Sequence, residues 1–153
     1  MEMKIYKLYH GDALMPWGKA TRVTNTKWFV FIAGCEGQDP TRDWRQGGPV
    51  VEGAEAQTRL ALQKMKDRLE EAGTSLDYMV HMTWYVRGPF PEGTGVVDSP
   101  NFREDVAHEF FKKHCPKLCL DNNPITYDLV GVASLALKDM LVEIGCIAAI
   151  PDD

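Results

Sequence analysis

The stretch of residues 53–86 constrains the fold of this chain more than any other. Mostly apolar residues recur in its first part at steps of three and four, the spacing of a buried stripe on an amphipathic helix: Thr58, Leu62, Met65, Leu69 and Ala72. Gly73 follows this stripe, where a left-handed residue commonly ends a helix, and residues 78–86 then alternate at a period of two. The stretch predicts a helix, a glycine stop and a strand, and the helix needs a sheet on which to pack.

The composition is that of an ordinary globular domain. The 153 residues are 44% hydrophobic and 25% charged, which argues against a disordered or fibrous chain and favours one domain over residues 1–153. The net charge of −5 and the lack of a Lys/Arg cluster argue against nucleic-acid binding. No apolar run approaches the roughly 20 residues of a membrane span, and the first ten residues lack a signal-peptide core. We expect a cytoplasmic protein with neither nucleic acid nor membrane as partner.

The four cysteines raise the question of a metal site. Cys115 and Cys119, with His114 beside them, resemble a fragment of a zinc site, but no second half of Cys or His follows at a matching separation. Free thiols are the favoured interpretation. Cys35 and Cys146 lie in strand-like runs and are interpreted as small core residues. The sequence therefore predicts no metal site.

The other elements are predicted from shorter signals. Residues 5–9 alternate weakly, as in an edge strand, and the apolar run 28–33 is typical of a buried strand that ends at Gly34. Ser99 and Pro100 suit the N-cap and first position of a second helix. The apolar residues of this helix repeat at four-residue steps: Phe102, Val106 and Phe110.

The last part of the sequence contains two further strand-like runs, residues 126–135 and 140–150, whose short connection 136–139 predicts an antiparallel hairpin. Two helices cannot cover both faces of a sheet of four to six strands, so we expect both on one face, in an α+β sandwich. By alternation the other face carries Met79, His81, Thr83, Tyr85 and Arg87. This set is too apolar for a solvated face and too polar for a monomer core, which favours burial against further copies in a closed ring.

Several of these motifs together resemble the Rid superfamily, the reactive intermediate deaminases, also called YjgF-like proteins. The resemblance covers the chain from about Trp28 onward and rests on Gly34, the strand 80–86, the ending 140–148 (MLVEIGCIA) and eight residues around the first helix: Glu55, Ala56, Gln57, Thr58, Leu62, Leu69, Ala72 and Gly73. It implies a chorismate-mutase-like fold with a mixed or antiparallel sheet and two helices packed on one face. It also implies a homotrimer with a central barrel, small-molecule sites at the subunit interfaces, and hydrolysis of enamines and imines to a keto acid and ammonia without a cofactor or metal.

The resemblance also implies site residues. A glutamate of the last strand corresponds to Glu143, and a glycine whose backbone faces the ligand corresponds to Gly34. The family's arginine, which clamps the substrate carboxylate through its planar fork, falls on or next to Tyr127, and residues 123–135 contain no arginine or lysine. This departure argues against simple 2-imino acids as substrates. The family's asparagine falls near Glu104, and its tyrosine falls near Ala20, outside the matching motifs.

Each candidate also has a structural interpretation. Tyr127 and Glu104 either bind ligand or are, respectively, a packing residue and a surface residue in the first turn of a helix. Trp17 either stacks on a flat ligand or anchors the N-terminal loop. His81 is interpreted as a structural histidine, and the charged residues of 52–71 as a solvated helix face. Arg87 is the favoured replacement for the clamp, and its alternative role is that of a solvated strand end. The cations that could replace the clamp are Lys19, Arg22, Arg87 and Arg103.

Glu143 is the only charged residue in the run 140–150. A charge in an apolar strand is costly to bury unless it is paired, so Glu143 marks either a site or a structural ion pair. As a site residue it acts as general base toward water, or as acceptor for a substrate amine or hydroxyl. The first hypothesis is a small-molecule hydrolase of the enamine/imine deaminase type with altered specificity. The second is a non-catalytic ligand-binding or regulatory trimer of the same fold.

Overall fold

The computed structural model describes residues 1–8, 18–42, 49–116 and 125–151. Trp17, one of the predicted site residues, and Cys119 lie outside these ranges. No helix in the described ranges is long and apolar enough to cross a membrane. The strands and α-helices follow in this order: β1 (Lys4–Leu8), β2 (Ala20–Thr24), β3 (Thr26–Glu36), α1 (Ala54–Glu71), β4 (Met79–Arg87), α2 (Glu104–His114), β5 (Thr126–Val132) and β6 (Val142–Pro151).

Helix α1 forms as its periodicity predicts. Its buried side is made of Gln57, Thr58, Ala61, Leu62, Met65 and Leu69. Gly73 ends the helix with a φ of +79°, and its N–H donates to the carbonyl of Glu70 at 3.1 Å. The N–H of Thr74 donates to the carbonyl of Leu69 at 3.0 Å, so the two bonds make the Schellman end for which glycine is favoured. The chain then passes through the short 3-10 helix Leu76–Tyr78 into β4.

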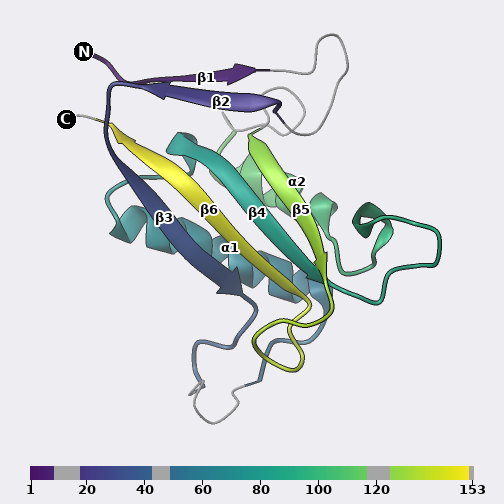
Figure 1. The fold of residues 1–153 in the computed structure, drawn as a ribbon. Helices are drawn as coiled ribbons and strands as arrows, with labels where there is room; N and C mark the ends of the chain where they lie inside the picture. Colours follow the sequence, from purple (N-terminus) through teal and green to yellow (C-terminus); the bar gives the residue numbers. More distant parts are fainter. Residues whose placement is uncertain (9–17, 43–48, 117–124, 152–153) are drawn as a thin grey trace.

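The main sheet has the order β3-β6-β4-β5 and both helices lie behind it (Figure 1). β6 is antiparallel to β3 and to β4, whereas β5 is parallel to β4. The core lies between the sheet and the helices, where Trp84 of β4 packs edge-on against Phe102 with ring centroids 5.3 Å apart. This is the α+β architecture expected from the sequence, with two helices on one face.

The predicted hairpin between the last two strands is wrong, because β4 lies between β5 and β6 (Figure 1). The crossover through α2 brings β5 alongside β4 in the parallel direction, as a right-handed strand–helix–strand unit commonly does. The connection between β5 and β6 therefore crosses the end of β4 instead of forming a tight turn. β6 fills the middle of the sheet.

Several boundaries also differ from the sequence prediction. β5 ends at Val132 instead of residue 135, and β6 begins at Val142 instead of residue 140. β1 pairs with β2, which the sequence analysis assigned to no strand, in a separate two-stranded sheet. β3 continues past Gly34 to Glu36, because a register shift between Ile32 and Cys35 accommodates the glycine inside the strand. The second helix begins at Glu104, because Ser99 instead follows the short 3-10 helix Val96–Asp98.

Gln57 ties α1 to the segment that leads into β6. Its side chain is 2% exposed, and its amide nitrogen donates to the carbonyls of Val51 and Asp139, each at 3.0 Å. Its amide oxygen accepts the N–H of Leu141 at 2.8 Å. A buried amide with all these bonds fixes the backbone on both sides of it. Gln57 thus positions the start of β6, where Glu143 lies.

Candidate functional site

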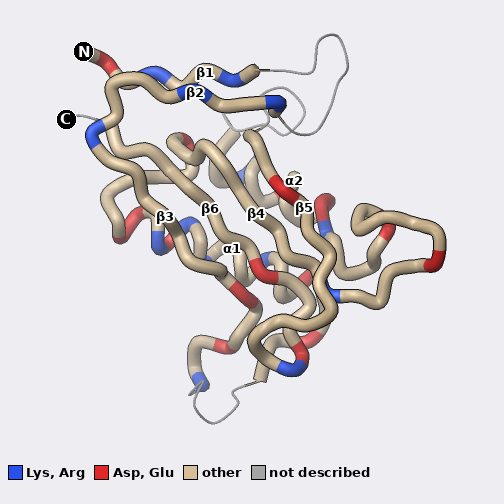
Figure 2. Tube along the Cα trace, in the orientation of Figure 1, with Lys and Arg blue, Asp and Glu red and all other residues tan. Residues whose placement is uncertain are grey.

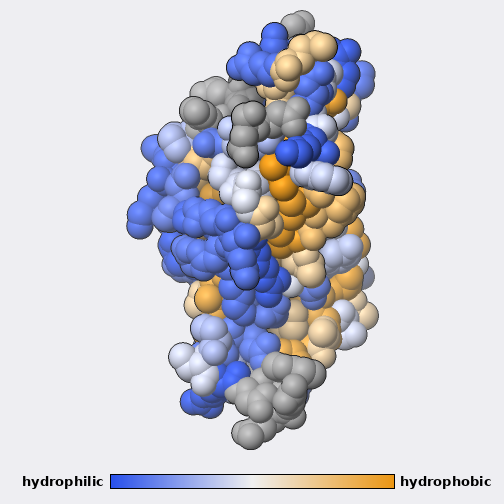
Figure 3. All heavy atoms as spheres, turned by 90° about the vertical axis from the view of Figure 1, so that its left-hand side faces the viewer, coloured by the Kyte–Doolittle hydropathy of each residue, from blue (hydrophilic) through white to orange (hydrophobic). Residues whose placement is uncertain are grey.

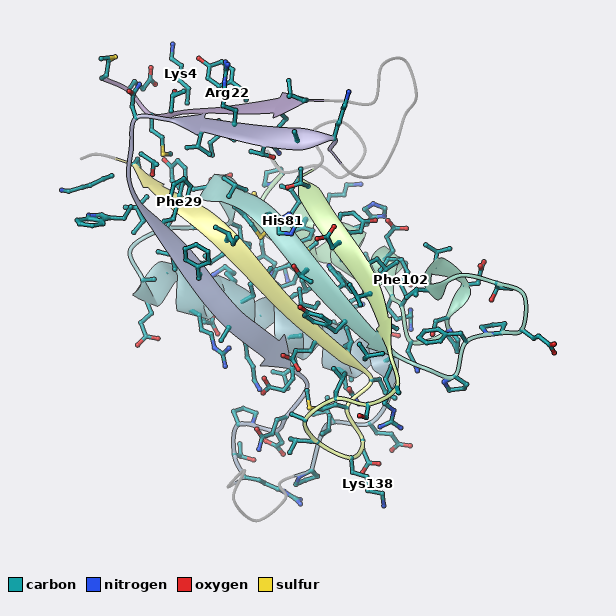
Figure 4. All side chains as sticks on the ribbon, in the orientation of Figure 1. Lys4, Arg22, Phe29, His81, Phe102 and Lys138 are labelled. Carbon is teal, nitrogen blue, oxygen red and sulfur yellow. The ribbon has the colours of Figure 1, made fainter. Side chains whose placement is uncertain are left out.

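The face of the sheet opposite the helices is rich in large apolar side chains. Phe29 and Phe31 of β3 expose 48% and 75% of their surface. In Figure 4, Phe29 and His81 lie on the side of the sheet that faces the viewer, away from the helices. Seen from the side of β3, hydrophobic residues gather along the sheet side of the molecule and hydrophilic residues along the helix side (Figure 3). Exposed apolar surface of this extent is typical of an interaction face.

The alternation predicted for this open face holds for three of its residues. His81, Thr83 and Tyr85 line a hollow on it. Met79 does not lie there, since it is 1% exposed and belongs to the core. A register shift between Met79 and His81 in the pairing with β6 breaks the alternation at the start of β4.

Glu143 lies near the start of β6, on the open face, opposite Glu36 of β3 and Tyr85 of β4. Its side chain crosses directly over Gly34. A Cβ on Gly34 would lie 2.5 Å from the Cδ and 2.6 Å from the Cγ of Glu143, and closer still to its Oε1. Gly34 thus allows the carboxylate to lie against the backbone of β3. The structure brings together the two residues that the sequence assigned most directly to a site.

The carboxylate of Glu143 has no hydrogen bond or ion pair within the described ranges. Burial raises the pKa of this carboxyl, and the nearby Glu36 raises it further. Glu36 is itself compensated, since its Oε1 accepts from the Nζ of Lys64 at 2.8 Å. Glu143 is therefore an uncompensated, partly buried acid, which favours the functional interpretation over a structural ion pair.

Two hollows meet at Glu143 and Gly34, which line both. The sheet hollow, about 300 Å³, lies on the open face and includes Phe31, His81 and Tyr85. The edge hollow, about 470 Å³, includes Glu36, Arg68 and the apolar residues Ala136, Leu137 and Met140. Each is large enough for a small molecule, and Glu143 is accessible from both.

Arg68 of α1 also lines the edge hollow and is not predicted as a site residue from the sequence. The prediction that the charged residues of 52–71 form only a solvated helix face is wrong for Lys64 and Arg68. Lys64 pairs with Glu36, and the Nη1 of Arg68 donates to the carbonyls of Ala33 and Gly34 at 3.3 and 3.1 Å. The signal was present in the spacing, because the two cations flank the buried stripe four residues apart.

His81 is held by a hydrogen-bond network on the open face. The hydroxyl of Thr126 donates to the carbonyl of Val80 at 2.9 Å, so at 3.0 Å its oxygen accepts from the Nδ1 of His81. In the neutral ring the Nε2 then carries the lone pair. It lies 3.4 Å from the Thr83 hydroxyl and 3.5 Å from the Oδ2 of Asp128. The hydroxyls of Thr126 and Thr83 thus hold the ring in place, whereas a neutral Nε2 and the Asp128 carboxylate are both acceptors and make no hydrogen bond with each other.

Tyr127 and Glu104 contact each other, but on the helix side of the sheet. Tyr127 lies opposite Met82 of β4, and its hydroxyl donates to the Oε1 of Glu104 at 3.3 Å. Burial raises the pKa of Tyr127, and the Glu104 carboxylate adds to this effect. The cavity between them is about 10 Å³, which is room for one water molecule at most. The structure thus does not bring these two residues together with Glu143.

Tyr127 faces the helices, so the adjacent residues of β5 face the open side. Thr126 and Asp128 are opposite His81 and Thr83, which lie on the open face. The position that the family's arginine occupies, on or next to Tyr127, therefore presents on this face a hydroxyl or an acid. Asp128 and Glu143 are the only charged residues of β5 and β6 (Figure 2).

Arg87 lies at the end of β4 and lines neither hollow. Its Nη1 donates to the carbonyl of Lys138, in the segment before β6, and its backbone N–H donates to the carbonyl of Leu141 at 2.9 Å. Arg87 thus holds the segment that walls the edge hollow. Arg87 therefore contacts the segment before β6, and its side chain does not line the space beside Glu143.

No cluster of three or more His, Cys, Asp or Glu residues suited to a metal exists in the described part of the chain. Cys35, Cys115 and Cys146 are buried thiols that take part in no disulfide within the described ranges. The Sγ of Cys115 donates to the Oδ1 of Asp77 at 3.2 Å.

The fold and the placement of Glu143 and Gly34 define a class: an α+β protein with two helices on one face of its sheet and, on the other, a partly buried glutamate that lies over a glycine. A family model described as endoribonuclease L-PSP matches residues 10–150. The chain belongs to this family, which is the Rid group that the sequence resembles. Among curated proteins, none matches the sequence.

Solved structures of the group share this fold. YyfB from Yersinia pestis, a Rid-family protein of unknown function, is 21% identical with a TM-score of 0.68, and the match covers 98% of this chain and 100% of that one. TdcF from E. coli, solved with bound serine, is 26% identical with a TM-score of 0.57 over 90% of each chain. Yeast Mmf1 is 22% identical with a TM-score of 0.57, over 96% of this chain and 99% of that one.

Proposed function

We propose that the protein is a small-molecule hydrolase of the enamine/imine deaminase type, with Glu143 as its general base. The observation that carries this proposal is the uncompensated carboxylate of Glu143 at the meeting point of two hollows. A raised pKa makes a carboxylate a better proton acceptor near neutral pH. The family membership supports the reaction class.

The reaction uses water and needs no group besides those of the protein and the substrate. Glu143 accepts a proton from water while the oxygen attacks the carbon of the C=N bond and the nitrogen takes up a proton. The resulting tetrahedral carbinolamine loses ammonia as its C–N bond breaks and its hydroxyl gives up a proton. One imine and one water thus give one carbonyl compound and one ammonia.

The site is proposed to be completed by neighbouring copies in a homotrimer. The open face presents Phe29, Phe31 and Tyr85, which are 48%, 75% and 37% exposed, and the sheet hollow opens on it. Packing this face against other copies would bury that apolar surface and exclude bulk water from Glu143, which strengthens electrostatic interactions there. Small-molecule ligands would then lie between subunits, in a protein that we place in the cytoplasm.

Two alternatives have specific observations behind them. The acid or hydroxyl at the position of the family's arginine favours a non-catalytic ligand-binding trimer over a deaminase of simple 2-imino acids. The family's description names an endoribonuclease. The net charge of −5 and the two acids, Asp128 and Glu143, on the open face make a polyanion a poor ligand for this chain.

The test is ammonia release from an enamine made in place. A threonine dehydratase supplies 2-aminocrotonate from threonine or 2-aminoacrylate from serine, and ammonia release is compared with and without the protein. We expect acceleration by the wild type and by Glu71→Gln, an exposed control at the end of α1, and loss of at least about 100-fold in Glu143→Gln, as for removal of a general base. Full turnover by Glu143→Gln would refute the mechanism. No acceleration by the wild type would eliminate the standard deaminase activity on these two enamines.

A further inference from the structure

The guanidinium of Arg68 is fixed at the edge of β3. Its Nη1 lies 3.3 Å from the carbonyl of Ala33, 3.1 Å from that of Gly34 and 3.2 Å from the Sγ of Cys35. Ala33 and Gly34 lie in the register shift between β3 and β6, where a bulge interrupts the regular ladder. The bulge provides the carbonyls that hold the arginine in place.

These contacts use one corner of the guanidinium only. In the described structure, every hydrogen bond of the Arg68 side chain runs through Nη1. The opposite edge, made by Nε and Nη2, keeps its two parallel N–H donors for another partner. That edge has the geometry that binds a carboxylate in bidentate fashion. Arg68 lines the edge hollow, which it shares with Glu143 and Gly34.

The charges around the edge hollow favour a ligand with an anionic group near Arg68 and a different, non-anionic group near Glu143. Glu36 is paired with Lys64 at 2.8 Å, and both side chains are less than one-fifth exposed, so these two charges compensate each other. Arg68 and Glu143 remain as one cation and one anion on the lining. The lining of the sheet hollow includes no lysine or arginine, and Asp128 lies on the same open face. A ligand carboxylate is therefore favoured on the side of Arg68.

We infer that Arg68 is the carboxylate-binding residue of the site, at the edge of β3, and that the substrate is a small amino- or imino-carboxylate whose nitrogen-bearing carbon lies at Glu143. This assignment rests on the proposed function for the role of Glu143. It replaces the predicted Arg87, which lines neither hollow and whose Nη1 is bonded to Lys138. The cation comes from α1 and not from a strand.

The experiment measures binding without catalysis. The probe is 2-oxobutanoate, the keto acid that hydrolysis of 2-aminocrotonate would yield, and its uncharged amide is the matched probe. Binding is followed by calorimetry and by the shift of the Arg68 Nε–H signal in proton–nitrogen NMR spectra. The variants are Arg68→Gln and Arg68→Lys, which keeps the charge and one donor. The control is Arg59→Gln, on the same helix, where Arg59 pairs with Glu109 at 2.8 Å.

We expect Arg68→Gln to weaken the binding of 2-oxobutanoate about 10- to 100-fold, as loss of a charged bidentate contact implies. Arg68→Lys should lose less of this affinity, and Arg59→Gln should bind 2-oxobutanoate as the wild type does. The amide should bind weakly, and with equal affinity to the wild type and to Arg68→Gln. Where ammonia release is measurable, Arg68→Gln should raise KM with kcat largely kept. A role in bracing β3 alone would instead weaken both probes equally.

The inference is overturned if Arg68→Gln binds 2-oxobutanoate like the wild type, or if Arg68→Gln loses the same affinity for the keto acid and for its amide. It is also overturned if the wild type does not bind the keto acid. These outcomes are separate from those of the proposed function. Arg68-dependent binding without any ammonia release would refute the deaminase and support the assignment of Arg68. Ammonia release that is indifferent to Arg68 would do the reverse.

Discussion

Replacing Gly34 by alanine tests the placement of Glu143 most directly. The new Cβ would lie 2.5 and 2.6 Å from the Cδ and Cγ of Glu143, well inside van der Waals contact. The three heavy atoms nearest to this Cβ all belong to the side chain of Glu143. The backbone itself accepts alanine, because Gly34 is not among the glycines with positive φ. The penalty therefore comes from one side chain.

The expected size follows from this geometry. Overpacking of this kind costs about 1–3 kcal/mol in unfolding free energy. In a Glu143→Ala background the colliding Cγ, Cδ and Oε1 atoms are gone, and Gly34→Ala should become neutral or stabilise by about 0.4–1 kcal/mol through the unfolded chain. The coupling between the two positions should then be about 1–4 kcal/mol, above the deviation of about 0.5 kcal/mol shown by independent sites.

The assay is urea unfolding of the wild type, both single variants and the double variant. All are measured at one protein concentration, because the stability of an oligomer depends on concentration. Gly95→Ala is the control, since a Cβ there meets nothing closer than the Cγ2 of Val97 at 3.9 Å. Additive effects of Gly34→Ala and Glu143→Ala, within about 0.5 kcal/mol, would show that the carboxylate does not lie over Gly34.

Three further outcomes are expected. Gln57→Leu should lower the unfolding free energy by about 2–4 kcal/mol, because three backbone groups lose their hydrogen bonds to a buried amide. Gln63→Leu loses one exposed bond to a neighbouring side chain and should change the unfolding free energy by less than about 0.5 kcal/mol in the same urea assay. The raised pKa of Glu143 means that its protonated form is favoured by folding, so the stability of the wild type relative to Glu143→Gln should fall as pH rises above the ordinary glutamate pKa of about 4.3; a difference that stays constant between about pH 4 and pH 7 would contradict the burial of this group. Phe31→Asp should dissociate the proposed trimer, so that analytical ultracentrifugation finds a species smaller than three times the chain mass of 17.2 kDa. Val97→Asp, at a position 62% exposed beside the sheet, should leave the mass of the assembly unchanged.

The unit of α1 and β4 could be predicted from sequence because its signals are local. A buried stripe, a glycine at the C′ position and a period of two each specify a backbone state within a few residues. The structure confirms the helix and its end, with Gly73 at positive φ. The exception is Met79, where pairing with β6 introduces a register shift. That shift depends on a strand more than 60 residues away and leaves no local mark.

Strand order could not be predicted for the same reason. The short connection before β6 suggested a hairpin, but β4 occupies the position between β5 and β6. Pairing is decided by which apolar faces bury each other, and the crossover through α2 already places β5 beside β4. The tendency of neighbouring strands to pair is therefore overridden here by the packing of a helix.

The residues of the candidate site also divide into those with a local signal in the sequence and those that depend on the folded sheet. Glu143 and Gly34 were predictable, because a single charge in an apolar strand and a glycine after another strand are visible in the sequence. Arg68 was predictable only in part: its position four residues from Lys64, beside the buried stripe, is visible in the sequence, but its partners are carbonyls of a bulge that exists only in the folded sheet. Tyr127 and Glu104, two of the site residues predicted from the resemblance, contact each other but lie across the sheet from Glu143. The register of β5 against β4 decides which of its residues face the helices and which face the open side, and register cannot be read from the sequence of one strand.

The electrostatics of Glu143 favour function over structure as the explanation of this residue. A carboxylate that stabilises a fold normally has a lowered pKa, because its partners favour the charged form. Glu143 has a raised pKa, its neighbour Glu36 opposes its charge, and the nearby cation Lys64 is bonded to Glu36. Ionised Glu143 therefore costs the folded state free energy at neutral pH. An amide or apolar residue would fit the strand better, so the acid is best explained by what it does to a ligand.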